Sequence, residues 1–565
     1  MWAQALALII ALDAVGKMAP LSSGITKPAG ESMTRAEANE LMSEPTGSLS
    51  RGWTSSGSLD RSVRVPLRGT GYAFFKHIRG RETYYGTAEM AGFVARVGAR
   101  MKAAEPDSVV GIGNVSLRKG GRSRWHRSHQ TGRDVDIAMF LIDRKGKARN
   151  PQDFRSFGPD LKSRDGRGMT FDVARNLSLV LAMIEDMDVG VQWIFCAEYL
   201  KQAMLEAART RGIDGEVLER LGRVLHQPTD ALPHDDHFHV RLYCSVEDRL
   251  YGCLDRPPLW SWVDRGDAAY EARVSALSRI LAHEALDLRV DAVGWLKRIR
   301  ARPAVPALVA LLNSEEEKLA SASLSALRAI GDPSAIPGIL EAVSRAEDLK
   351  WASRLFRTLT AFWTHDNLAV ATRFLASPKE LLHAELHGAD HTDFLITSAG
   401  LLERFGTLKE APMLLPLLDH RRRSVQTAAE KALRRITAHS SSPKVASSKG
   451  RRHDRAVKWW RKLLTDQEDW HELLRLGLRR AGHKLGDDLT TSKNVRRLIK
   501  AVDDRRAYVS HNAVRLLSSV TGHEVEPYFR SRRALRRHWE RWLEQNGDSW
   551  KERPPQAPAG IQGAP

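Results

Sequence analysis

Hydrophobic and polar positions follow two different patterns along the chain, and the change falls near residue 257. Before it, short apolar runs rich in β-branched residues alternate with segments whose apolar residues recur at helical spacing. The first part is therefore expected to be a mixed α and β domain over residues 62–257. The patterns predict strands over 108–117, 135–142, 189–196 and 237–243, and helices over 86–102 (with Thr87 as N-cap), 172–187 and 198–211.

After residue 257 the pattern is almost entirely helical and Ala/Leu-rich. A clear unit covers 304–331, and similar helix pairs follow Ala335 and recur near Met413 and Val495. This pattern of helix pairs resembles HEAT-like repeats of about 40 residues, which must stack because no unit buries its own apolar face. We expect an all-α solenoid over 266–439 and 456–550, interrupted by a basic flexible loop at 440–455.

The two ends of the chain differ from the domains between them. Trp2–Leu12 is an apolar run with the length of a signal h-region, but no basic residue precedes it. Residues 1–20 are interpreted as an imperfect export signal, with a buried helix as the alternative; the run is too short for a transmembrane anchor. A Ser/Gly/Thr-rich flexible lead-in over 21–61 and a disordered tail over 551–565 are expected.

Composition narrows the class of protein and leaves its partner open. Of 565 residues, 42% are hydrophobic and 27% charged, as in a soluble protein of two or three domains. The net charge of +19 favours acidic partners, and nucleic acid, anionic lipid and carboxylate-rich cell wall all qualify. Of three cysteines, Cys244 and Cys253 could bridge a loop in an oxidising compartment, which would leave Cys196 as a small core residue.

Two dense polar stretches carry the candidate chemistry: WHRSHQTGRDVDI at 125–137 and PHDDHFHVRL at 233–242. A turn at Gly132 would bring Asp136 back toward His129, and His237 and His239 would share one face of a strand. One imidazole from each stretch plus the carboxylate makes three N/O ligands, the set of a catalytic zinc at roughly 2.0–2.2 Å. Such an ion lowers the pKa of its water toward ~7 and polarises a carbonyl, while the remaining imidazole moves protons.

These motifs resemble those of the penicillin-insensitive murein endopeptidases, zinc peptidases related to lysostaphin-type and D-Ala-D-Ala peptidases. The resemblance runs over Tyr72–Asp255 and includes GNVSLRKGGR and VQWIFC. It implies an α+β zinc peptidase domain with a small antiparallel sheet, which hydrolyses D-alanyl–meso-diaminopimelyl cross-links of peptidoglycan. Penicillin would not acylate it, because no serine nucleophile is needed. The family's catalytic core does not require the helical repeats.

The resemblance also implies a role for each residue that matches a family motif. It assigns His129, Asp136 and His239 as zinc ligands, His237 as the catalytic histidine and His234 as its partner. His126 would serve a second metal or lie behind the ligands, with Asp172 as a distant partner whose local match is poor. A cysteine pair after the second motif matches Cys244 and Cys253.

Simpler interpretations exist for several of these residues. A single His on an apolar strand is usually a core residue, whereas four residues at both spacings are hard to explain that way. Asp134, Asp235 and Asp236 are expected to be solvated or to orient the ligands. Arg133 and Arg241 would bind a substrate carboxylate, although exposed arginines are common.

The sequence thus predicts an exported, periplasmic zinc D,D-endopeptidase whose helical repeats bind the wall or a protein partner. A D,D-carboxypeptidase and a non-catalytic wall-binding scaffold are the alternatives. A cytoplasmic nucleic-acid-binding repeat protein is suggested by the charge alone, and nucleic acid is not the expected partner.

Overall fold

The computed structural model describes residues 33–228, 233–362, 364, 366–441, 444–465, 469–523, 525 and 531–547. The predicted export signal, the first residues of the lead-in and the predicted C-terminal tail lie outside the described residues. Within the described residues, no helix has both the length and the apolar character needed to cross a membrane.

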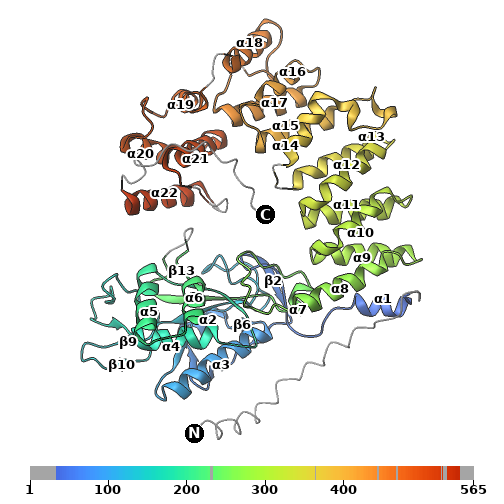
Figure 1. The fold of residues 1–565 in the computed structure, drawn as a ribbon. Coiled ribbons are helices and arrows are strands. Elements are labelled where there is room, and N and C mark those ends of the chain that lie inside the picture. Colours follow the sequence, from blue (N-terminus) through green and yellow to red (C-terminus); the bar gives the residue numbers. More distant parts are fainter. Residues whose placement is uncertain are drawn as a thin grey trace.

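The N-terminal domain is built on a seven-stranded mixed sheet with strand order β13-β12-β14-β8-β7-β5-β4 (Figure 1). The sheet is larger than the predicted small antiparallel sheet, and its direction is confirmed only in part. Four of its six pairings are antiparallel, but β5 pairs with β7 and β12 with β13 in parallel. Helices cross over between the strands of each parallel pair, as such pairs require. The strands are β4 (Arg68–Gly69), β5 (Tyr72–Phe74), β7 (Val110–Ile112), β8 (Asp134–Ala138), β12 (Val191–Phe195), β13 (Leu225–His226) and β14 (His237–Leu242).

Short strands and helices surround this sheet. The small sheets pair β1 (Leu49–Trp53) with β2 (Ser56–Asp60), β3 (Val63–Arg64) with β6 (Tyr85–Gly86), and β9 (Leu141–Ile142) with β10 (Ala148–Arg149) and β11 (Thr170–Phe171). The helices are α2 (Lys76–Arg81), α3 (Ala88–Ala104), α4 (Val173–Ile184), α5 (Glu198–Thr210), α6 (Gly215–Val224) and α7 (Val246–Arg249). The predicted strands and helices are present with shifted bounds: α3 ends two residues later than predicted, and the predicted strand 135–142 is divided into β8 and β9. Thr87 caps α3 by accepting a hydrogen bond from Met90 N.

The two faces of the sheet differ in chemistry. In the register of β8, β14 and β12, Asp136 lies opposite His239 and His239 lies opposite Phe195, so these residues share one face. The alternate residues are fully buried and join one apolar core with side chains of α3, α4 and α5; they include Val135, Ile137, Ile194, Phe238 and Val240. Helices therefore cover one face, and the polar motifs occupy the other.

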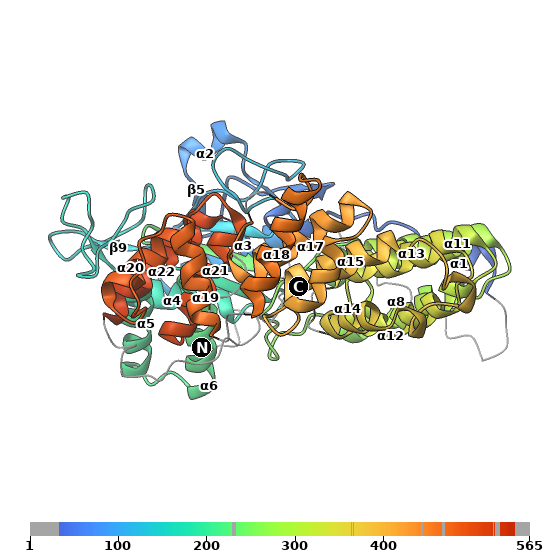
Figure 2. The same ribbon diagram turned by 90° about the horizontal axis from the view of Figure 1, so that it is seen from above.

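The second half of the chain is a solenoid of helix pairs. Helices α9, α11, α13, α15, α17 and α21 contact one another in succession and form one layer. The solenoid rises from α8 and bends over, so that α19–α22 lie above the sheet domain (Figures 1 and 2). The helices are α8 (Asp267–Ile280), α9 (Leu286–Arg298), α10 (Val305–Ala310), α11 (Glu317–Ile330), α12 (Ile336–Arg345), α13 (Leu349–Thr358), α14 (Asp366–Ala376), α15 (Thr392–Phe405), α16 (Leu415–Leu418), α17 (Arg423–Thr437), α18 (Arg451–Thr465), α19 (Trp470–Arg480), α20 (Ser492–Ala501), α21 (Ala507–Thr521) and α22 (Arg532–Asn546).

The lead-in expected to be flexible is ordered from residue 35 to residue 60. Helix α1 (Arg35–Leu41) begins at Thr34, which forms a capping box with Glu37. Its Ala38 is fully buried in the apolar core of the solenoid, and Arg35 pairs with Asp287 at 2.6 Å. The β1–β2 hairpin buries Leu49 and Leu59. The prediction is wrong here because a few buried side chains and one cap order a segment that lacks periodicity.

The basic loop predicted over 440–455 is shorter than expected. Helix α18 begins at Arg451, inside that range. Val445 is buried in the apolar core of the solenoid, and His453 Nε2 lies 3.3 Å from Asp419 Oδ1. These contacts hold a segment whose composition alone resembles a linker.

Candidate metal site

A tight turn brings the first polar stretch onto the sheet. Gly132 has φ of +72°, and a Cβ atom there would lie 2.7 Å from Leu59 Cδ2 and 3.0 Å from the Gly86 Cα. The backbone therefore requires glycine both for its conformation and for its close packing. The turn leads directly into β8, which places Asp134 and Asp136 on the polar face of the sheet.

Four of the five histidines predicted at the site converge on one buried carboxylate. The Oδ1 atom of Asp136 lies 3.1 Å from His129 Nε2, 3.3 Å from His237 Nε2 and 3.4 Å from His239 Nδ1. The other oxygen, Oδ2, lies 3.6 Å from His126 Nε2. The two motifs, about a hundred residues apart in the sequence, thus meet where β8 pairs with β14.

Hydrogen bonds orient two of these rings. His129 Nδ1 lies 2.6 Å from the Val115 carbonyl oxygen, and this bond favours the tautomer that leaves Nε2 free to bind a metal. The backbone of His129 has φ of +63°, and its amide donates to Asp134 Oδ2 at 2.9 Å. His237 Nδ1 lies 2.7 Å from Asp236 Oδ1, which directs its Nε2 toward Asp136. Asp134 and Asp236 therefore orient the cluster.

The charges in the cluster shift its protonation. Burial alone would raise the pKa of Asp136, but His129 and His237 hold that pKa well below its usual range. Burial would lower the pKa of His237, but the carboxylates of Asp136 and Asp236 raise it to about 10. Burial and the neighbouring His129 lower the pKa of His126 to about 4. Asp136 is therefore an anion at neutral pH, as a metal ligand must be.

The donor atoms fit a divalent metal that binds imidazole and carboxylate. Among the described residues, four buried atoms of the cluster have no hydrogen-bond partner: Nε2 of His126, His129 and His239, and Oδ1 of Asp136. Buried polar atoms normally have partners, so atoms without one call for a ligand. Two groups have ligand atoms within 4.8 Å of one another; one is His126, His129 and Asp136, and the other is His234, His237 and His239.

Two predicted site residues have other roles. The Arg133 side chain is 2% exposed and donates to Asp255 Oδ1 at 2.9 Å and to the Leu242 carbonyl at 2.8 Å, so it holds the fold and does not face a substrate. Asp172 caps α4 and pairs with Arg175 Nε at 2.6 Å. Both predictions are corrected because these buried groups are saturated by internal partners.

Arg241 lies on the polar face of the sheet, next to the cluster. Its guanidinium donates to Asp134 through Nε at 2.7 Å and through Nη2 at 3.3 Å, and it lies over the Phe195 ring. Asp134 also accepts a hydrogen bond from the His129 amide. Arg241 is therefore positioned beside the candidate ligands, and contact with a substrate stays a prediction.

The structure adds residues that sequence reasoning missed. Asn114 donates from Nδ2 to Asp136 Oδ2 at 3.2 Å, and its Oδ1 accepts a hydrogen bond from Thr83 Oγ1 at 2.8 Å. Aromatic rings border the histidines: Phe154 lies 4.7 Å from His237 and Phe195 lies 5.4 Å from His239 between ring centroids. Asn114 and Phe195 lie within GNVSLRKGGR and VQWIFC, the two stretches that already carried the family resemblance, whereas no local signal marked Phe154.

Cys244 and Cys253 form a disulfide nine residues apart, as their spacing suggested, and Cys196 is buried and free. The bridge follows β14 directly and lies beside the Arg133–Asp255 pair, since Cys244 N donates to Asp255. It therefore ties the end of the strand that carries His237 and His239 to the chain beyond it.

Fold and site together define a mixed α/β domain with a buried His/Asp centre suited to a metal, joined to a helical solenoid. Residues 50–279 match the sequence model of the penicillin-insensitive murein endopeptidase family, which confirms the resemblance for this part of the chain. Residues 319–345 match the PBS lyase HEAT-like repeat, which confirms the repeat prediction there.

Two curated relatives match this chain over its N-terminal domain. A protein named penicillin-insensitive murein endopeptidase from Haemophilus influenzae is 29% identical over 219 residues, which are 38% of this chain and 70% of that protein. One of the same name from Escherichia coli is 29% identical over 214 residues, which are 38% of this chain and 72% of that protein. A solved phycocyanin lyase complex from Nostoc covers 47% of this chain and 97% of its own at 17% identity, but its TM-score of 0.24 carries no argument.

Proposed function

We propose that this protein is a zinc-dependent peptidoglycan hydrolase that cleaves D-alanyl–meso-diaminopimelyl cross-links in the periplasm after export. The observation that carries the proposal is the convergence of His129, Asp136 and His239 on one sheet face, with buried donor atoms that have no hydrogen-bond partner among the described residues. The matched family and the names of the relatives support the choice of substrate.

We assign a different role in the proposed hydrolysis to each residue of the cluster. His129, Asp136 and His239 would hold the zinc, with His126 against the second oxygen of Asp136. When bound, zinc supplies Lewis-acid activation of water and of the scissile carbonyl. His237 Nε2 lies 3.3 Å from Asp136 Oδ1, which supports a role in which His237 would move a proton or donate a hydrogen bond to the reacting group. His234 extends this set, with its ring centroid 5.2 Å from that of His237.

The surroundings of the cluster suit an anionic peptide. Arg241 lies on the same sheet face, two residues along β14 from His239. We place a substrate carboxylate beside its guanidinium, whose flat array of donors suits such a group. Phe154 and Phe195 border the histidines and would exclude water from the reacting amide.

Digestion of purified cross-linked peptidoglycan, with and without a chelator, tests the proposal. The expected result is chelator-sensitive loss of muropeptide dimers with a gain of monomers, restored by zinc. Asp136→Ala should abolish it, whereas Asp160→Ala, which removes an exposed carboxylate of the same domain, should not.

Each other outcome points to a different protein. Loss of terminal D-alanine with the dimers intact would indicate a carboxypeptidase. No change from protein that holds zinc would indicate a different amide substrate. No change and no zinc would indicate a scaffold and would overturn the proposal.

A further inference from the structure

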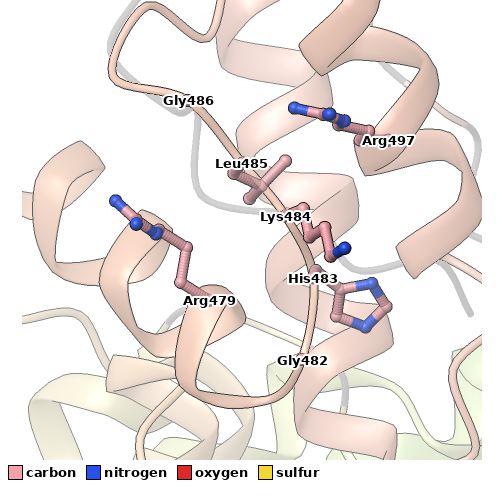
Figure 3. A pocket seen from close by; sticks show the side chains of 7 residues that line it. All are labelled: Arg479, Gly482, His483, Lys484, Leu485, Gly486 and Arg497. Atoms are coloured by element: carbon pink, nitrogen blue, oxygen red, sulfur yellow. The ribbon is translucent and has the colours of Figure 1, made fainter.

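The metal site does not account for the concentration of basic residues at the far end of the solenoid. A hollow of about 480 Å³ lies between the end of α19, the loop that follows it and the middle of α20 (Figure 3). We refer to it as the first hollow. It is lined by Arg479, Gly482, His483, Lys484, Leu485, Gly486 and Arg497.

The cations of the first hollow are not neutralised by acidic neighbours. Among the described residues, Arg479 and Lys484 have no ion pair, and Arg497 donates only to the Asn494 amide oxygen, at 3.4 Å. The nearby carboxylates have other partners: Asp504 pairs with His483 at 2.9 Å, and Asp487 and Glu472 pair with Arg475 at 2.8 Å and 2.6 Å. Arg475 lowers the pKa of Glu472, and Arg479 contributes to this shift without forming an ion pair among the described residues. The hollow thus presents positive charge that the fold leaves available.

A second basic hollow of about 510 Å³ lies next along the solenoid. Its cations include Arg434, Arg435, Lys444 and Arg506. Of its two acidic residues, Glu403 pairs with Lys431 at 3.0 Å and Glu430 accepts a hydrogen bond from Ser441 Oγ at 2.5 Å. Asp504 links the two hollows, because its Oδ2 accepts from both His483 of the first and Arg506 of the second. Two adjoining basic hollows suit a polymer with repeated negative charges better than a single ion.

We propose that the first hollow is a non-catalytic binding site for the free carboxylates of peptidoglycan stem peptides. The inference rests on the proposed function, because the polymer is the substrate of the metal site. Guanidinium groups bind carboxylates through paired hydrogen bonds. Helices α19–α22, which carry the hollow, lie above the N-terminal domain (Figure 1). Polymer bound in the hollow would therefore be held close to the domain that cleaves it.

Other polyanions fit the surroundings less well. Single-stranded nucleic acid is usually held by aromatic rings on which its bases stack. The only ring lining the first hollow is that of His483, which pairs with Asp504. The second hollow adds the ring of Tyr508, over which the Arg434 guanidinium lies. An anionic membrane favours apolar side chains that enter the lipid. The large hydrophobic residues that are exposed among those described, Met187 and Leu259, both lie outside the solenoid.

The test compares two triple variants of the full chain that remove the same charge. The hollow variant removes the arginine and lysine charges that line the first hollow; it carries Arg479→Gln, Lys484→Gln and Arg497→Gln. The α20 variant removes three exposed cations of that helix that do not line the hollow; it carries Lys493→Gln, Arg496→Gln and Lys500→Gln. Co-sedimentation with intact sacculi measures binding, in the presence of a chelator so that the polymer is not digested. Circular dichroism melting verifies that both variants remain folded.

We expect the hollow variant to bind sacculi roughly tenfold more weakly, since three surface ion pairs are lost, and the α20 variant to bind as the parent does. Sacculi whose carboxylates have been amidated should bind the parent as weakly as untreated sacculi bind the hollow variant. Equal loss in both variants, or no loss in either, would overturn the proposal. Undiminished binding to amidated sacculi would also overturn it, and equal competition by DNA or by a phosphate polymer would assign the hollow to another anion.

The co-sedimentation assay tests binding in the hollow independently of the proposed hydrolase activity. Binding is measured without catalysis, so failure to cleave cross-links leaves it intact. If the hydrolase is correct, both triple variants should cleave small soluble dimers at the parental rate. On intact sacculi, only the hollow variant should be slower.

Discussion

Replacing Arg133 by methionine should destabilise the N-terminal domain without altering its chemistry. The guanidinium lies in a nearly solvent-free site, 2.9 Å from an Asp255 side chain that is 4% exposed. Its removal leaves that carboxylate buried with the Cys244 amide as its remaining partner. Breaking a buried pair from one side costs about 3–5 kcal/mol. For a domain of this size, that corresponds to a melting transition roughly 6–20 °C lower.

Calorimetry of the full chain measures the shift, and hydrogen exchange of peptides from β8 and β14 assigns the transition to this domain. Arg68→Met, at an exposed position, should change the transition by about 1 °C or less. The double variant Arg133→Met with Asp255→Leu should recover much of the loss, because no unpaired charge remains. A normal melting curve together with a raised KM for cross-linked substrate would refute the argument and make Arg133 a substrate ligand.

Three further predictions concern the metal and the pH. Asn114→Ala should weaken zinc binding about 10- to 100-fold, because Asp136 loses its orienting donor; unchanged affinity in a chelator competition would contradict this. Zinc at a hundred times its Kd should stabilise the domain by about 2.7 kcal/mol, an effect that Asp136→Ala should remove; an equal shift in the variant would place the metal elsewhere. Burial lowers the pKa of His439 to about 4, so the folded solenoid binds fewer protons than the unfolded chain. The stability that His439 contributes to the solenoid should be constant above about pH 6.5 and fall by up to roughly 3 kcal/mol as the pH drops to 4. His439→Gln should flatten that decline, and an unchanged decline in urea titrations would count against the assignment.

Local patterns in the sequence were sufficient to predict most elements and the residue types of the candidate site. Alternation with period two predicted the strand that carries His237 and His239 on one face, and helical spacing with a Thr87 cap predicted α3. The spacing of His129 and Asp136 around Gly132 also follows from local geometry, since a left-handed turn is a property of a few residues. These features depend on neighbours in the chain and can therefore be predicted from it.

Other features depended on contacts that the sequence does not display. Arg133 and Asp172 resemble site residues in one dimension, but each lies against an internal partner. Helix α1 is ordered because Ala38 enters the core of a solenoid that begins more than two hundred residues later. The parallel strand pairs likewise arise from helical crossovers, whose direction local alternation does not encode.

The sequence by itself determined the ligand types, the strands that present them and the two-part organisation of the chain. The tertiary structure decided that both motifs meet at Asp136, that Asn114 and the phenylalanines border the site, and which arginines are used internally. The physical reason is the separation along the sequence over which each interaction acts. Backbone preferences and side-chain periodicity act over a few residues, whereas burial, ion pairing and the convergence of ligands are set by segments that pack together from distant parts of the chain.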